Sequence, residues 1–448
     1  MMSEKIDPRV VLEQLCTSPS MQSFERILEE DTLVTLQAVD VLKAIFRRAA
    51  IFIYDTGMGK TIMATAYMRA LLNEDSSRKF IFLMKKSQVQ QTPKKIQKNL
   101  GKQYPIIAST ADKKSLDAIL DNDRFLGATV LMLTHQCLDN KRLSDALFRH
   151  RKEYTGMIID EAHNLNNIIE ANSALKLEGM LANFEYKLAL TATPIVSDLE
   201  QLTRLSKILD PKKYSDAKKL FYAFRKGTYT FDDDPCFFIS RSREDFGIKS
   251  EIHGEPIYVM PQKDQVNIPG NEVPLKCKGP GAFNQLNALI SFLKDKLARG
   301  ERGLIYINRH EVREWILPYL DEEGIDYDCI NGYTKHTDRV RIMHEFNDLK
   351  SLPIVITSVT EAIDLDCDWV LFYELTLNVS QMIGRSYRGL YDKTLMVYFM
   401  ITLDTHEEES FEHIYDVAKL IMRVTKKRND AIFDVYNSSI DKQVGNRN

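Results

Sequence analysis

Short apolar runs alternate with longer amphipathic stretches along most of the chain. In the first half, the apolar runs are Ala50–Tyr54, Phe80–Met84, Thr129–Leu133, Met157–Ile159 and Lys187–Leu190. Short apolar runs of this kind are typical of buried parallel strands. The stretches that follow two of them, Thr61–Leu72 and Gln88–Leu100, have helical spacing. This pattern predicts an α/β unit built on a parallel sheet.

The same alternation restarts in the second half and predicts a second α/β unit. Its apolar runs are Gly303–Ile307, Ile325–Ile330, Ile354–Thr357, Trp369–Tyr373 and Leu395–Ile401, with helical spacing over Glu311–Glu322 and His336–Asn347. Between the two series, residues 206–280 contain several prolines and the run Asp232-Asp233-Asp234. We interpret this run as a solvated acidic turn, with a cation site as the alternative. We therefore expect a helical segment at 1–30, units at 31–205 and 281–425, a connecting segment at 206–280 and a tail at 426–448.

Composition narrows the class of protein without naming a function. The chain has 448 residues, of which 44% are apolar and 27% charged, with a net charge of −3. A nucleic-acid site must therefore be a local patch, because the chain is not basic overall. Six cysteines are scattered without a close pair, which disfavours a zinc or disulfide framework. No apolar run approaches the ~18 residues of a membrane span, so we expect a cytoplasmic protein without membrane contact.

A glycine-rich loop follows the first predicted strand. Its sequence is Asp55-Thr56-Gly57-Met58-Gly59-Lys60-Thr61, and it opens a predicted helix. This is the context of a phosphate-binding P-loop, in which backbone N–H groups and the helix N-terminus face phosphate oxygens. Lys60 would reach the β- and γ-phosphates of ATP, and Thr61 would ligate Mg²⁺. One departure is Tyr54, which stands where the full pattern has glycine; the alternative is a Gly-Lys-Thr turn that binds nothing.

Two carboxylates end a later apolar strand. Asp160 and Glu161 follow Ile158-Ile159, 100 residues after Lys60. An aspartate at a strand end can hold Mg²⁺. The glutamate beside it can orient and deprotonate the attacking water. The alternative is an acidic helix N-terminus favoured by the helix dipole, which the P-loop earlier in the chain makes less attractive.

The motifs together resemble a known family. Asp160-Glu161-Ala162-His163 resembles the DEAH form of motif II in superfamily 2 helicases and translocases. Leu190–Pro194 is similar to their motif III and Gln381–Arg388 to their motif VI, in the same order along the chain. Leu36-Gln37 and the segment Phe238–Asp245 resemble the Swi/Snf-type group of double-stranded DNA translocases. The compact form is similar to helicases of phages and large DNA viruses.

The resemblance implies two RecA-like domains with ATP bound between them. It implies that Gln37 reads adenine, and that Gln381, Arg385 and Arg388 reach the nucleotide from the second domain. Arginines placed in this way supply charge to the γ-phosphoryl group. By the same analogy the nucleic acid contacts are Lys85, Lys86, Thr134, His135, Thr357 and Ser358, with Arg309 and Lys335 as further candidates. Hydroxyls, amides and lysines of this kind grip phosphates without reading sequence.

The function expected from this resemblance is an ATP- and Mg²⁺-dependent DNA helicase or translocase. Its substrate would be duplex, forked or branched DNA, in replication, recombination or repair, and we expect the motor to be a monomer. One alternative is an RNA helicase or a viral-type transcription-release ATPase. Another is a P-loop ATPase that switches a protein partner and is not stimulated by nucleic acid. Comparing ATPase stimulation by duplex DNA, single-stranded DNA and RNA separates the three.

Overall fold

The computed structural model describes residues 33, 35–165, 181, 184–192, 199–261, 281–359, 363–386, 393–427 and 429–445. The chain forms two compact units, Met1–Ser242 and Arg243–Asn448. Each unit is an α/β domain built on a parallel sheet, which confirms the predicted fold class of two RecA-like domains. Among the described residues, no helix combines the length and the apolar composition needed to cross a membrane.

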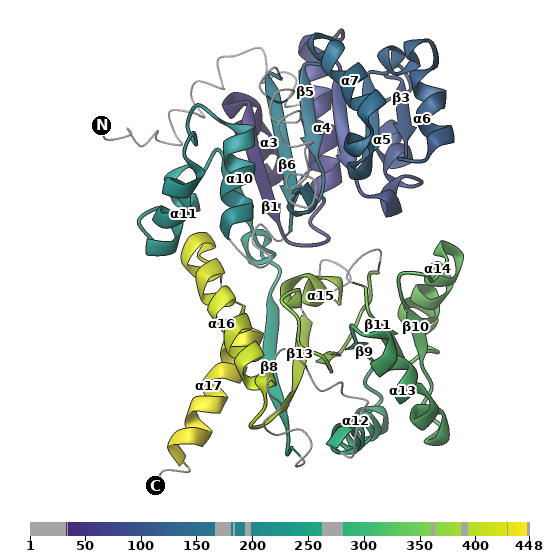
Figure 1. Cartoon of the computed structure of the whole chain (residues 1–448), viewed down its shortest axis with the longest axis vertical. Coiled ribbons are helices and arrows are strands. Elements are labelled where there is room, and N and C mark those ends of the chain that lie inside the picture. The colour runs from purple at the N-terminus through teal and green to yellow at the C-terminus, as the bar shows by residue number, and fades with distance from the viewer. Residues whose placement is uncertain are drawn as a thin grey trace. The chain divides into compact units, whose positions relative to one another are not determined.

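The first unit contains a seven-stranded sheet in the order β3-β4-β2-β5-β6-β1-β7, with all strand pairs parallel. In chain order its helices and strands (Figure 1) are α3 Thr35–Arg47, β1 Ala49–Tyr54, α4 Lys60–Glu74, β2 Phe80–Met84, α5 Thr92–Leu100, β3 Ile106–Ser109, α6 Lys113–Leu120, β4 Val130–Thr134, α7 Lys141–Arg149, β5 Gly156–Ile159, β6 Tyr186–Thr191, α10 Leu199–Leu209, α11 Ala217–Lys226 and β7 Phe238–Arg241.

The central strands form because they are buried on both faces. Every residue of β1, β2, β4, β5 and β6 is buried, as their continuous apolar runs predict. Helices between them begin at local caps: the Asp112 carboxylate accepts the Ser115 N–H at the start of α6, and Asn140 caps α7 in the same way. Sequence therefore specifies both the buried strands and the points at which helices begin.

The second unit contains a six-stranded parallel sheet in the order β10-β11-β9-β12-β13-β8. Its elements (Figure 1) are β8 Ser250–Val259, α12 Gly281–Ala298, β9 Gly303–Tyr306, α13 His310–Glu322, β10 Asp328–Ile330, α14 His336–His344 continued by a π-helical turn Glu345–Leu349, β11 Ile354–Thr357, β12 Trp369–Phe372, α15 Val379–Arg385, β13 Lys393–Thr402, α16 His406–Thr425 and α17 Asp430–Gly445.

Alternating residues of this second sheet face two separate cores. In β9, Leu304 and Tyr306 pack with the core that includes Ile342 of α14 and Phe411 of α16. Ile305, between them, packs on the other face with the core that includes Leu289 of α12. The period of two therefore places helices α12 and α13 on one face and α14, α15, α16 and α17 on the other.

The segment expected to connect the units is instead divided between them. Residues 206–241 belong to the first unit, because β7 pairs in parallel with β1. Strand β8 belongs to the second unit and pairs with β13 along its whole length. The described part of the expected tail is also structured: it contains α17, whose Ala431 and Val435 are buried in the core.

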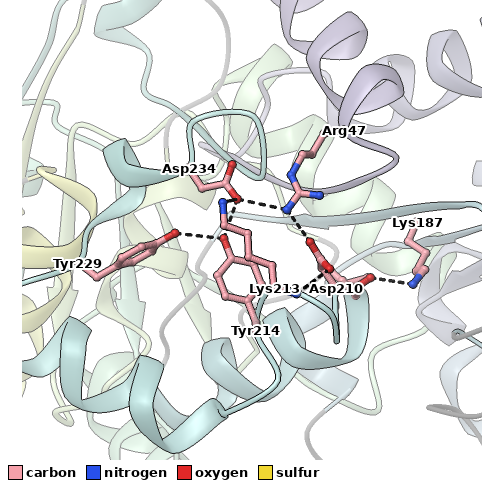
Figure 2. A network of polar contacts seen from close by, with 8 residues as sticks. Arg47, Lys187, Asp210, Lys213, Tyr214, Tyr229 and Asp234 are labelled. Atoms are coloured by element: carbon pink, nitrogen blue, oxygen red, sulfur yellow. Dashed lines mark hydrogen bonds and ion pairs between the residues drawn. The ribbon is translucent and has the colours of Figure 1, made fainter. Parts of the chain in front are cut away.

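A network of polar contacts links residues 210–234 to the end of α3 (Figure 2). The Asp234 carboxylate accepts hydrogen bonds from Lys213, 2.6 Å away, and from the Tyr214 hydroxyl, 2.7 Å away. Arg47, at the end of α3, contacts both Asp234 and Asp210. Asp234 is buried, so the interpretation of residues 232–234 as a solvated acidic turn is wrong at this position. The cations that surround Asp234 compensate its burial.

Candidate ATP site

The predicted catalytic residues of the first unit lie at one edge of its sheet. Strands β4, β2, β5, β6 and β1 are neighbours and run in parallel, so their carboxyl ends meet at the same edge. The P-loop follows β1, and Asp160-Glu161 follows β5. In open α/β sheets this edge is where ligands bind. The topology therefore brings together residues that are 100 positions apart in sequence.

The loop between β1 and α4 has the backbone of a phosphate-binding turn. Gly57 and Gly59 have φ values of 83° and 76°, in the left-handed region that glycine adopts without strain. Helix α4 then begins at Lys60, whose Nζ lies 2.8 Å from the Tyr54 carbonyl oxygen and 3.2 Å from that of Asp55. An ammonium group inside a loop at a helix N-terminus is the donor set that a polyphosphate requires.

Tyr54, the departure from the P-loop pattern, has a defined structural role. Its buried hydroxyl donates to Asp40 Oδ2 at 2.6 Å. The same fully buried carboxylate receives Arg241 through Nε at 2.7 Å and through a terminal nitrogen at 2.9 Å, and Lys43 at 3.1 Å. Burial, then the Asp40 charge, raises the pKa of Tyr54 far above its ordinary value, so the hydroxyl stays protonated as a donor. Asp40 thus joins α3, the start of the P-loop and β7.

Gln37 lies against the P-loop. Its Nε2 donates to the carbonyl oxygen of Met58 at 3.0 Å. A Cβ atom at Gly59 would come within 3.2 Å of this amide nitrogen. Gln37 therefore fixes the loop from the side of α3, in a position compatible with the adenine contact that we expect from sequence.

The two carboxylates of motif II are buried beside each other. Asp160 is 3% exposed, and its Oδ1 and Oδ2 accept the Glu161 N–H at 3.0 Å and the Gln88 amide at 3.1 Å. Burial and then the charge of Glu161 raise the pKa of Asp160, while Lys60 acts in the opposite direction. Glu161 has a φ of 49°, unusual for a residue other than glycine. Strained backbone and opposed electrostatics are typical of catalytic sites.

Two residues expected to contact nucleic acid are buried next to motif II. Thr134 and His135 are 1% and 3% exposed, so neither presents its side chain to solvent. Burial lowers the pKa of His135 to about 4, against the effect of its hydrogen bond with the Asp160 backbone. Among the described residues, its Nε2 has no hydrogen-bond partner. A short helical turn directly after β4 folds the His135 side chain inward, which strand periodicity does not reveal.

His163 links motif II to the end of β6. Its Nδ1 lies 3.2 Å from the Thr191 hydroxyl and 3.6 Å from Glu161 Oε2. Thr191 is the first threonine of the motif III segment, and residues 193–198 lie outside the described residues. The histidine thus contacts both the predicted base and the neighbouring strand.

The nucleic-acid candidates of the second unit also separate into buried and accessible side chains. Thr357 is buried, and its hydroxyl donates to the Ile330 carbonyl oxygen at 2.9 Å, so it holds the ends of β11 and β10 together. Ser358 is half-buried, Lys335 is exposed, and Arg309 lies 3.5 Å from Glu374. In the first unit, Lys85 is half-buried and Lys86 exposed. The accessible residues remain predicted nucleic-acid contacts.

Motif VI belongs to the second unit and is described only in part. Gln381 and Arg385 are half-buried residues of α15. Arg388 lies outside the described residues. The roles expected for these three residues in hydrolysis remain predictions.

Sequence reasoning missed Asp40 as an anchor and Gln88 as a partner of Asp160. Neither residue carries a local sequence signal for its role. Gln88 reaches Asp160 because β2 and β5 are adjacent, with Leu83 opposite Ile159. Asp40 reaches Arg241 across 201 positions because β7 joins the sheet next to β1.

Residues 36–232 match the SNF2-related domain, and residues 284–390 match the helicase conserved C-terminal domain. The chain is similar to the ATP-dependent helicase FUN30 of Saccharomyces cerevisiae, with 24% identity over 59% of this chain and 22% of that protein. It is similar to the uncharacterized ATP-dependent helicase YqhH of Bacillus subtilis, with 21% identity over 88% of this chain and 79% of the relative. The match to FUN30 thus spans less than a quarter of that protein.

Among solved structures, the chain is similar to the Sulfolobus solfataricus SWI2/SNF2 ATPase core in complex with dsDNA. The identity is 15%, the TM-score is 0.41, and the match covers 88% of this chain and 97% of the other.

The chain therefore carries an SNF2-related domain followed by a helicase conserved C-terminal domain. It is an ATP-hydrolysing enzyme of the helicase and translocase class.

Proposed function

We propose that this enzyme uses ATP hydrolysis to move along duplex or branched DNA, in replication, recombination or repair. The observation that carries the proposal is the P-loop and the Asp160-Glu161 pair at one sheet edge of a domain that matches the SNF2-related family. A helicase C-terminal domain follows in the same chain. The compact form resembles the helicases of phages and large DNA viruses, and the resemblance to Swi/Snf-type translocases favours duplex DNA over RNA.

The residues at the sheet edge fit ATP with Mg²⁺. The backbone of residues 56–61 and the Lys60 ammonium would hold the phosphates, Gln37 the adenine side, and Thr61 and Asp160 the metal. When bound, Mg²⁺ neutralises phosphate charge. Glu161 is the base that accepts a proton from water, and its neighbours Asp160 and His163 hold it in place. Gln381, Arg385 and Arg388 supply polar and positive groups from the second unit.

Nucleic acid, in this proposal, contacts the accessible members of the expected set. These are Lys85, Lys86, Arg309, Lys335 and Ser358. The net charge of −3 means that binding depends on such local contacts. Each phosphate contact releases counterions, so the affinity should fall steeply as salt rises.

An ATPase panel tests the proposal. Wild-type turnover is measured without nucleic acid and with duplex DNA, a fork, a four-way junction, single-stranded DNA and single-stranded RNA, each at several salt concentrations. We expect duplex or branched DNA to stimulate most, with the steep salt dependence described above. Glu161→Gln is the matched control, because the amide keeps the shape of the side chain but accepts no proton. It should bind ATP and DNA without turnover. Stronger stimulation by RNA than by any DNA would overturn the choice of substrate.

A further inference from the structure

One side chain joins the turn after β2 directly to the motif II carboxylate. Gln88 Nε2 donates to Asp160 Oδ2 at 3.1 Å, and Gln88 Oε1 accepts the backbone N–H of Lys85 at 3.1 Å. The amide nitrogen of Gln88 therefore binds a residue of the candidate ATP site, and its amide oxygen binds the backbone of the turn. Rotating the amide to satisfy one partner alone would lose the other.

The pairing of β2 with β5 brings Gln88 close to Asp160. Strands β2 and β5 are paired in parallel, and the Asp160 N–H donates to the Leu83 carbonyl oxygen at 2.9 Å. The chain leaves β2 at Met84 and forms a three-residue helical turn, Lys86–Gln88. In that turn the Lys86 side chain faces solvent, whereas Gln88 is half-buried. An exposed cation and a partly buried hydrogen bond are thus two positions apart on one three-residue turn.

The hydrogen bond has an electrostatic consequence for Asp160. The carboxylate is almost fully buried, and each of its oxygens accepts one donor, the Gln88 amide or the Glu161 N–H. A buried anion depends strongly on its few donors, because water does not replace them. A small displacement of the turn would lengthen the Gln88 contact and so change the position and charge stabilisation of Asp160.

We propose that Gln88 is a positioning residue that couples nucleic-acid contact at the turn 85–88 to the placement of Asp160. The inference rests on the proposed function, since it requires that nucleic acid binds at this turn. Coupling of this kind is reciprocal: if bound DNA improves the ATP site, bound nucleotide improves DNA affinity by the same factor. Gln88 would then account for part of the stimulation of the ATPase by nucleic acid.

The test compares Gln88→Leu with Gln90→Leu. Leucine keeps the approximate size of the side chain but makes neither hydrogen bond, and Gln90 is an exposed residue two positions further on. Affinity for a non-hydrolysable ATP analogue is measured with and without duplex DNA, and affinity for DNA with and without the analogue. Coupling factors of roughly 5 to 150 are typical. We expect the factor to fall close to 1 in Gln88→Leu and to stay at the wild-type value in Gln90→Leu.

Three results would overturn the inference. The first is a wild-type coupling factor in folded Gln88→Leu. The second is an equal loss of DNA affinity with and without the analogue, which would make Gln88 a direct DNA contact. The third is a wild-type enzyme that no nucleic acid stimulates, which contradicts the proposed function itself and is recognised before any variant is made. If Gln88→Leu does not fold, Gln88→Asn decides the question, because it keeps the amide but is one methylene too short to hold both partners.

Discussion

The two ends of the first sheet both bury charged side chains, but they arrange them differently. At the amino end, Arg47 and Lys213 surround the Asp234 carboxylate, and Arg47 also contacts Asp210 (Figure 2). Lys187, at the start of β6, donates to the Leu209 carbonyl oxygen at 2.8 Å. Each of these charges meets an opposite charge or a backbone dipole, as a structural network requires.

At the carboxyl end, like charges lie together and the backbone is strained. The carboxylates of Asp160 and Glu161 are adjacent and buried, and Glu161 has a positive φ. His135 is buried, and one of its ring nitrogens has no hydrogen-bond partner in the part of the chain that the structure describes. Such an arrangement costs stability unless a ligand completes it. The difference indicates that the charges of the amino end maintain the fold, whereas those of the carboxyl end suit the chemistry proposed for them.

The largest expected effect is a loss of ATP turnover when Lys60 is removed from the carboxyl end of the first sheet. Lys60→Ala should lower ATP turnover by on the order of 10³-fold or more, because phosphate charge is then left to backbone dipoles. The unfolding free energy should change by only about 1 kcal/mol, the typical effect of one substitution, because Lys60 is half-buried. Steady-state ATPase assays and denaturant unfolding measure the two quantities. Near-normal turnover in a folded variant contradicts the P-loop assignment.

Motif VI shows whether the chemistry depends on the second unit as well. We expect Arg385→Ala to lower hydrolysis by about 10³-fold, the usual contribution of an arginine finger. ATP binding should survive, because the residues proposed to hold the nucleotide lie in the first unit. The same result is expected for Arg388→Ala. Nucleotide titrations beside ATPase assays with and without DNA are the measurement, and normal hydrolysis in either variant removes that arginine from the mechanism.

The residues predicted for catalysis at the carboxyl end have local sequence signals. The glycines of the P-loop and the acidic pair each follow an apolar run, so pattern alone predicts their edge of the sheet. Burial was not predictable in the same way. Thr134, His135 and Thr357 were all expected to contact nucleic acid, yet their side chains turn inward just at or after strand ends. Thr134 and Thr357 are the last residues of their strands, and periodicity does not specify whether a strand end is covered. His135 begins a turn, and periodicity within a strand does not specify which way a turn residue points.

The edge strands β3 and β8 were also missed, for a related reason. Strand β3 is half-exposed and only four residues long, and β8 contains both a glycine and a proline. Neither has the continuous apolar run of a central strand. Gly254 of β8 is needed because a Cβ atom there would lie 1.8 Å from the Ala431 carbonyl oxygen of α17. The sequence around Gly254 does not show this requirement, because it comes from the packing of α17, which lies far along the chain.

A substitution at the amino end of the first sheet should have an intermediate effect, on stability and not on catalysis. Asp234→Ala removes the shared partner of Arg47, Lys213 and Tyr214. We expect a loss of about 3 kcal/mol in unfolding free energy, at the lower end for a broken buried pair because Lys213 is 42% exposed and can be solvated. The KM for ATP should be unchanged. Denaturant unfolding is the measurement, and Glu323→Ala, which removes an exposed pair with Lys294, is the control with at most ~1 kcal/mol.

Tyr54→Phe should have the smallest effect. Tyr54 takes part both in the structural contacts of Asp40 and in the P-loop. Its side chain belongs to the Asp40 anchor, while its carbonyl oxygen contacts Lys60 in the P-loop. Tyr54→Phe deletes the hydroxyl but leaves the carbonyl, and Asp40 keeps Arg241 and Lys43. We therefore expect a loss of about 1 kcal/mol in unfolding free energy, the net value of one hydrogen bond, with turnover within roughly twofold of wild type.

Unfolding and ATPase measurements on the same preparation decide between the two roles of Tyr54. Tyr54→Phe shifts the denaturation midpoint alone if the Asp40 anchor is structural. A tenfold fall in turnover at unchanged ATP affinity would show instead that the anchor sets the geometry of the P-loop. The charges around Asp40 would then belong with the catalytic end of the sheet, and the separation between a stabilising end and a chemical end would not hold at this residue.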